Sequence, residues 1–181
     1  MTEARRAHDP GAGNTAALVV GLGSLDRGDD AVGPAVARAV GALALPGVRV
    51  VEHEDPTSLI ELWSTYDVAV VVDAVRSGAQ PGTIHVFEAT DGVAAWHASA
   101  SKGSAGTHTF GVVSAVELSR ALQRLPRRLV LVAVEAAGLD HGAPLSLPVA
   151  AAVEKAVDVV VHLLRPEQTP SQAGAGAHVP R

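Results

Sequence analysis

The sequence predicts an α/β fold, a three-layer α/β/α sandwich whose mostly parallel, twisted sheet carries helices on both faces. Short runs of β-branched residues alternate along the chain with stretches of helical spacing, which is the order of a βαβ protein. Residues 68–72 read Val-Ala-Val-Val-Val, the apolar run expected of a central parallel strand. The chain has 181 residues, of which 48% are hydrophobic and 18% charged, and this is enough for one domain with its own core.

Each element follows from a local pattern. Apolar runs predict strands at residues 16–21, 48–52, 68–73 and 129–134, and the alternation within 83–88 predicts an edge strand or hairpin partner. Helical spacing predicts helices at residues 31–43, 58–63, 110–123 and 148–164. Asp30 is a possible N-cap of the first of these helices, whose first turn tolerates Pro34.

A single domain is expected over residues 16–164. Segments 1–15 and 165–181 consist largely of small and polar residues and are predicted to be disordered, and 98–106 is predicted to be a flexible loop. No apolar run has the length of a membrane span, and the N-terminus lacks the apolar stretch of a signal peptide. We therefore expect a soluble, cytoplasmic protein with no membrane contact.

Composition excludes several classes of function. The formal net charge of −5 argues against binding to nucleic acid, which needs a basic face. The chain has no cysteine, so disulfides, thiolate metal sites and cysteine nucleophiles are excluded. Neither a Gly-x-Ser-x-Gly elbow nor a His-Glu-x-x-His helix is present. A metal site would have to use His, Asp or Glu.

Two acids, Asp29 and Asp30, follow the glycine turn after the first strand, in the segment Gly-Leu-Gly-Ser-Leu-Asp-Arg-Gly-Asp-Asp. Such a turn often binds phosphate, because backbone N–H groups at a helix N-terminus attract anions. Two carboxylates would repel a pyrophosphate, and the third glycine of the dinucleotide motif is missing at its usual spacing. The turn is therefore better suited to a cation. Adjacent residues in a turn point differently, so Asp29 is expected to cap the helix or tune charge rather than bind metal.

Ligands of open α/β sheets bind beyond the C-terminal ends of the strands. Three polar side chains are expected there: Asp30, Asp73 directly after the run 68–72, and His108 in the loop before the third long helix. Two carboxylates and one imidazole form a borderline-hard metal site with room for solvent or substrate. The plainer alternatives are a helix cap, a turn residue and a solvated histidine.

The other histidines carry less weight. His53 follows the second strand within an acidic cluster and is a candidate for a supporting role around the site, while His141 is a reserve candidate beyond the last strand. His85, on the expected edge strand, is predicted to be solvated.

These motifs resemble those of the hydrogenase maturation proteases, the endopeptidases that trim the C-terminus of nickel–iron hydrogenase large subunits. The resemblance runs from about residue 18 to 164 and rests on three elements in the right order. These are the glycine and acid pattern of 20–33, Val-Val-Asp-Ala at 71–74 followed by Pro-Gly-Thr at 81–83, and Thr-His-Thr-Phe-Gly at 107–111.

The resemblance implies that Asp30, Asp73 and His108 are the metal-binding residues, and we assign the catalytic role to the same three. The implied partner is the precursor of a nickel–iron hydrogenase large subunit, which presents its own nickel, so the resting enzyme need hold no metal. Two departures stand out. Ser24 replaces the usual Asn, and Glu-Asp-Pro-Thr-Ser at 54–58, stiffened by Pro56, replaces a glycine-rich segment.

Two other functions stay open on the sequence alone. One is a nucleotide- or phosphate-using α/β enzyme built on the glycine turn, against which the adjacent acids argue. The other is a non-catalytic module that checks the loaded precursor without cutting it. A plain α/β domain with capped helices is the remaining alternative. For the protease, the sequence leaves open whether nickel only positions the scissile bond, polarises its carbonyl or activates water.

Overall fold

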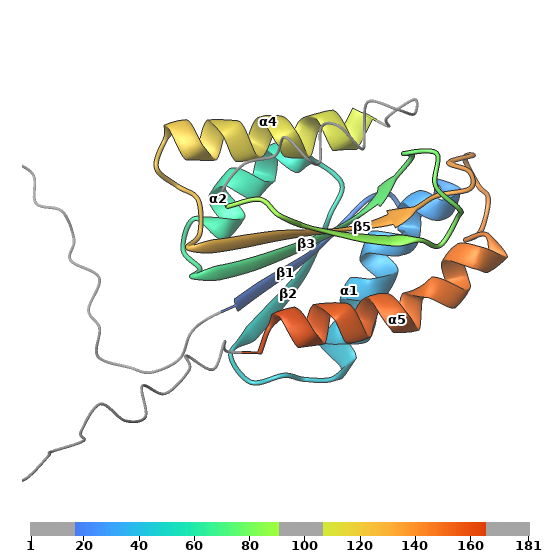
Figure 1. Ribbon diagram of the computed structural model, residues 1–181, viewed down its shortest axis with the longest axis horizontal. Helices are drawn as coiled ribbons and strands as arrows, with labels where there is room; N and C mark the ends of the chain where they lie inside the picture. Colours follow the sequence, from blue (N-terminus) through green and yellow to red (C-terminus); the bar gives the residue numbers. More distant parts are fainter. Residues whose placement is uncertain (1–16, 91–106, 166–181) are drawn as a thin grey trace, which may run out of the picture.

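A computed structural model of the protein describes residues 17–90 and 107–165, with side chains for 17–90 and 111–165. Its described part contains a sheet with the strand order β2-β1-β3-β5-β4 (Figure 1). Strands β1 (Ala17–Leu22), β2 (Val48–His53), β3 (Val68–Val75) and β5 (Arg128–Glu135) are parallel. Strand β4 (Ile84–Glu88) lies at the edge of the sheet, as the alternation of its residues predicts, and runs antiparallel to β5.

Helices cover both faces of this sheet, which confirms the predicted three-layer α/β/α sandwich (Figure 1). Helices α1 (Val32–Ala42) and α5 (Leu147–Leu163) pack on one face, and α2 (Leu59–Trp63) and α4 (Thr107–Ala121) pack on the other. The 3-10 turns η1 (Gly28–Ala31) and η2 (Pro56–Ser58) lead into α1 and α2. None of the helices in the described ranges combines the length and hydropathy that a membrane crossing requires.

The pleat of the strands divides the core in two. Successive side chains of a strand point to opposite faces, so Val70 and Val132 pack with α1 and α5, whereas Val71 and Leu131 pack with α2 and α4. Odd-numbered residues of β3 and β5 therefore face α2 and α4. This parity decides on which side of the sheet the polar side chains at the strand ends lie.

Two boundaries differ from prediction in ways that matter for the site. Strand β3 continues beyond Asp73 to Val75, because residues 73–75 still pair with 133–135 of β5. Helix α4 begins at Thr107, so His108 lies in its first turn and not in a loop. Polar residues suit a first helical turn, whose N–H groups have no partner within the helix. The predicted flexible loop 98–106, the predicted tail 1–15 and all but Arg165 of the predicted tail 165–181 fall outside the described residues.

The predicted cap of α1 is also wrong. Asp30 lies within the 3-10 turn η1, and the N-cap of the helix is Ala31, with no side-chain hydrogen bond. The carboxylate of Asp30 instead accepts a hydrogen bond from the N–H of Ser24.

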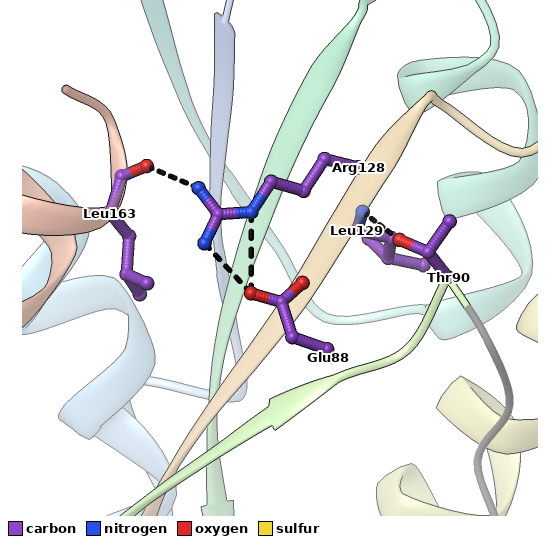
Figure 2. A network of polar contacts seen from close by, with 5 residues as sticks. All are labelled: Glu88, Thr90, Arg128, Leu129 and Leu163. Carbon is purple, nitrogen blue, oxygen red and sulfur yellow. Dashed lines mark hydrogen bonds and ion pairs between the residues drawn. The ribbon is translucent and has the colours of Figure 1, made fainter. Parts of the chain in front are cut away.

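The N-terminal edge of the sheet is fastened by a polar network (Figure 2). The guanidinium of Arg128, at the start of β5, donates to Glu88 of β4 at 2.7 and 3.2 Å and to the carbonyl oxygen of Leu163 at 3.1 Å. A cationic donor at the last carbonyls of a helix also complements its dipole. Nearby, the N–H of Leu129 donates to Oγ1 of Thr90 at 2.8 Å. These contacts tie β4 and α5 to the edge opposite Asp73.

Candidate active site

Asp30 is buried at the C-terminal edge of β1, with 4% of its surface exposed. Its Oδ2 accepts a hydrogen bond from the N–H of Ser24 at 2.9 Å. The turn is tight: Gly23 has φ +133°, and a Cβ on it would collide with the carbonyl oxygen of Asp30. Because Ser24 donates through its backbone, the change from the family's usual Asn keeps this contact.

Asp73 lies within β3, opposite Ala133 of β5, and is 2% exposed. The pairing of β3 with β1 ends at Val72, so Asp73 stands where the sheet loses a neighbouring strand. Its number parity with Val71 places its side chain on the face covered by α2 and α4. The turn role considered for Asp73 is therefore wrong. A carboxylate buried in an apolar strand is costly unless hydrogen bonds or charges compensate it, and Oδ1 of Asp73 accepts one such bond from the N–H of Ala74 at 2.8 Å.

His108 comes to the same edge from above the sheet. It belongs to the first turn of α4, and this end of the helix lies over the C-terminal ends of the strands (Figure 1). Helix α4 packs on the face toward which Asp73 points. The side chain of His108 is outside the described residues, so its meeting with Asp30 and Asp73 stays a prediction.

The turn η2 packs against α4 near the N-terminal end of the helix. A Cβ on Gly111 would lie 2.6 Å from Cγ of Pro56, so the helix and the proline ring are already in close contact. Asp55 holds the turn by accepting from the N–H and Oγ1 of Thr57 at 2.8 and 2.7 Å. The segment 54–58 thus packs against α4 near its N-terminal end.

His53 supports the same turn. Its Nδ1 lies 3.0 Å from Oγ of Ser58, which in turn donates to the carbonyl oxygen of Asp55. His53 is the last residue of β2, and this contact ties it to η2. Its effect on the candidate site is therefore indirect, through η2 and α4.

Asp29 points away from Asp30, as expected, but it caps no helix. It is 1% exposed, and its two oxygens accept four hydrogen bonds from the loop that follows β5. The donors are the N–H groups of Ala137 (2.8 Å), Gly138 (3.1 Å) and Ser146 (2.6 Å), and Oγ of Ser146 (2.9 Å). Asp29 is thus a structural clamp between the turn after β1 and the loop after β5.

The reserve candidate His141 belongs to the same junction. Its Nδ1 lies 2.9 Å from the carbonyl oxygen of Asp26, which also accepts from the N–H of Gly142. The N–H of Gly28 donates to the carbonyl oxygen of Ala143 at 3.1 Å. His141 therefore helps to join two loops, and the structure places it with a backbone carbonyl.

Sequence reasoning missed a buried carboxylate, Glu135, at the end of β5. It is 2% exposed and accepts from the N–H and Oγ of Ser77 at 2.8 and 2.6 Å and from the N–H of Gly78 at 2.9 Å. Nε2 of His85 is buried 3.7 Å from Oε2 of Glu135, and only 26% of the His85 side chain is exposed. The prediction of a solvated His85 is therefore wrong. A signal was present, since Glu135 follows an apolar strand just as Asp73 does.

Among the side chains that the structure describes, no three His, Asp or Glu groups gather closely enough to hold a metal ion. A third donor to a metal at Asp30 and Asp73 would have to come from outside that set. His108 is the candidate, because α4 begins over this edge of the sheet.

Comparison with known proteins assigns the family. Residues 49–163 match the model of the HycI family, described as hydrogenase maturation protease. The hydrogenase expression/formation protein HupD of Rhizobium leguminosarum bv. viciae is 30% identical over 108 residues, which are 59% of this chain and 52% of HupD. The aligned part of the chain thus spans about half the length of this curated relative.

Solved structures share the fold. The hydrogenase maturating endopeptidase HybD from Escherichia coli superposes with a TM-score of 0.70 at 22% identity, over 82% of this chain and 91% of HybD. An endopeptidase from E. coli gives a TM-score of 0.73 at 24% identity, with the same coverage of 82% and 91%. The [NiFe] hydrogenase maturation protease HybD from Thermococcus kodakarensis gives 0.64 at 24%, over 82% of this chain and 99% of its own. With the family model covering most of its length, this chain belongs to the hydrogenase maturation protease family.

Proposed function

We propose that this protein is an endopeptidase that removes the C-terminal extension of a nickel–iron hydrogenase large-subunit precursor once nickel has been loaded. The observation that supports the proposal is the pair of buried carboxylates, Asp30 and Asp73, at the C-terminal edge of the sheet. Family membership supplies the class of reaction. The substrate resembles what its relatives' names describe, a hydrogenase undergoing maturation.

Nickel enters this proposal as part of the substrate. Two carboxylates and an imidazole are suitable donors for a divalent transition metal and leave positions for the precursor's own ligands. The N–H of Ser24 holds Oδ2 of Asp30, so this carboxylate is oriented before the precursor arrives. Contact with the metal then fixes the scissile bond beside the site. Such positioning can contribute about 7–11 kcal/mol in the best cases. A bound metal can in addition polarise a carbonyl or activate water.

The structure disfavours the phosphate-binding alternative. A phosphate site at the turn after β1 would need free backbone N–H groups. The N–H of Ser24 donates to Asp30, that of Gly28 to Ala143, and that of Asp29 to Gly138. These donors already have acceptors within the chain and are not available to an anion.

Substitution of the three proposed ligands tests the proposal. We expect Asp30→Asn, Asp73→Asn and His108→Ala each to slow processing of a nickel-loaded precursor by about 100-fold or more, because each removes a proposed ligand of the precursor's metal. The matched control is Asp26→Asn, an exposed acid in the same turn as Asp30, which should process normally. Intact mass of the precursor over time gives the rates, and thermal melting shows whether each variant is folded.

The results separate the competing functions. Normal processing by all three variants would contradict the assignment of the site. A stable complex of the wild-type protein with an uncut, nickel-loaded precursor would instead identify a non-catalytic checkpoint module.

A further inference from the structure

A cavity of about 300 Å³ opens where β3 and β5 end. Its walls come from two segments, the loop after β3 and the residues directly after β5. They consist of small and apolar groups with one cation and one acid: Arg76, Gly78, Ala79, Pro81, Glu135 and the pair Ala136 and Ala137. Pro81 belongs to the Pro-Gly-Thr motif at 81–83, for which the site described above provides no task.

Both walls of the cavity continue along the chain from, or hydrogen-bond to, segments that carry the candidate site residues. Arg76 follows Asp73 by three residues along the same strand end. On the other wall, the N–H of Ala137 donates to Oδ2 of Asp29, the neighbour of Asp30. The cavity therefore lies at the same C-terminal edge of the sheet as Asp30 and Asp73.

Glu135, the acid in the cavity wall, already accepts hydrogen bonds from the protein. Both oxygens of Glu135 accept hydrogen bonds from Ser77 and Gly78, and its surface is almost fully buried. Its role is to hold the loop after β3 in one conformation. The residue next to this clamp is Arg76, so the base of the arginine side chain is fixed before any ligand binds.

Arg76, the cation in the cavity wall, differs from Glu135 in this respect. Arg76 is exposed, and in the described part of the chain no carboxylate or carbonyl oxygen pairs with its guanidinium. A guanidinium presents forked donors that match a carboxylate in a bidentate way. The small apolar residues around it leave room for the aliphatic part of an acidic side chain or of a chain terminus.

We infer that this cavity is a specificity subsite that binds a carboxylate of the precursor's C-terminal segment, with Arg76 as its ionic partner. This inference rests on the proposed function and adds a recognition element to it. The carboxylate is that of an acidic side chain or that of the chain terminus, and the two sources are distinguished by experiment. Arg76 acts on binding, because it lies beyond the proposed reacting centre.

The first experiment measures kcat and KM for cleavage of the nickel-loaded precursor by the wild type and by Arg76→Ala, Arg76→Lys and Arg127→Ala. We expect Arg76→Ala to raise KM by about 10-fold, with kcat changed by less than about twofold, as for loss of a charge-assisted hydrogen bond in binding. Lysine should restore only part of the loss, because it lacks the fork. Arg127 is an exposed arginine before β5, at the opposite edge, and its replacement should change nothing.

The second experiment identifies the carboxylate. Each Asp and Glu of the precursor's extension is changed to its amide, and in a separate precursor three added glycines displace the terminal carboxylate. The partner of Arg76 is the group whose removal raises KM for the wild type but not for Arg76→Ala, which is the signature of coupling in a double-mutant cycle.

The outcomes are distinct. If the wild type cleaves the precursor and Arg76→Ala has an unchanged KM, the inference is wrong and the proposed function stands. Equal losses in Arg76→Ala and Arg127→Ala, or no coupled carboxylate, would also overturn it. If the wild type neither binds nor cleaves the loaded precursor, the proposed function is wrong and the inference falls with it.

Discussion

Asp29 and Asp30 are adjacent, yet their carboxylates have different surroundings. Asp29 accepts four hydrogen bonds from the loop after β5 and is saturated by them. The Asp30 carboxylate accepts from the N–H of Ser24 in its own turn. The first acid therefore holds two loops together, and the second is the one proposed to contact the substrate's metal.

This division predicts the effect of Asp29→Asn. The amide would turn an NH2 group toward N–H donors, so at least one buried donor would lose its acceptor, at a cost of about 1–3 kcal/mol in free energy of unfolding. Ser146→Ala removes a single hydroxyl donor and should cost about 1 kcal/mol. Urea unfolding of both variants measures these costs, with Asp26→Asn as the control. An unchanged midpoint for Asp29→Asn would contradict the clamp.

Residue-level prediction succeeds for some acids and fails for others. Asp30 and Asp73 are recognisable because an acid that ends an apolar strand has few local explanations. The task of Asp29 depends on Ala137, Gly138 and Ser146, which are more than 100 positions away. The spacing of neighbouring residues in the sequence contains no information about such distant contacts. The clamp is therefore not predictable from the sequence pattern.

At the scale of elements, the turn η2 and the helix α4 act together. Pro56 is buried against Gly111, and Asp55 fixes the turn that carries the proline. We therefore expect the rigid turn η2 to fix the position of the first turn of α4, which contains His108, relative to the sheet.

Gly111→Ala tests this contact. Alanine is favoured over glycine in a helix by about 1 kcal/mol, so propensity alone predicts a more stable protein. The new Cβ would lie 2.6 Å from Cγ of Pro56, and we expect overpacking to cost about 1–3 kcal/mol and to slow processing. Melting temperature and processing rate are the two readouts.

The matched control is the double variant Gly111→Ala with Pro56→Gly, which removes the ring that the new methyl group meets. We expect it to recover most of the processing rate, although glycine makes the turn more flexible. If Gly111→Ala alone is fully active, the contact between Gly111 and Pro56 does not position α4.

The positions of the helices and strands are predicted well from the sequence, but their exact ends are not. Strands are recognised because β-branched apolar runs have few other uses in a chain with so few aromatic residues. The extension of β3 beyond Asp73 depends on its pairing with β5. The early start of α4 depends on packing against η2. Both ends are set by tertiary contacts, which override local propensity.

Across the whole molecule, the two edges of the sheet carry different kinds of contacts. At the N-terminal edge, Arg128 ties β5 to Glu88 and to the end of α5 (Figure 2). At the C-terminal edge, the loops are joined by backbone donors and by the buried acids Asp29 and Glu135. The fold thus presents a preorganised edge with Asp30, Asp73 and Arg76, and a separate edge that serves stability.

The central claim is that this edge cuts a precursor only when its nickel is in place. The most direct measurement mixes the purified protein with the nickel-loaded large-subunit precursor of the same organism and, in parallel, with the nickel-free precursor, and follows the intact mass of each. The proposal predicts loss of a C-terminal peptide from the loaded precursor alone. Equal cleavage of both precursors would contradict the metal contact, and no cleavage of the loaded precursor would contradict the protease itself.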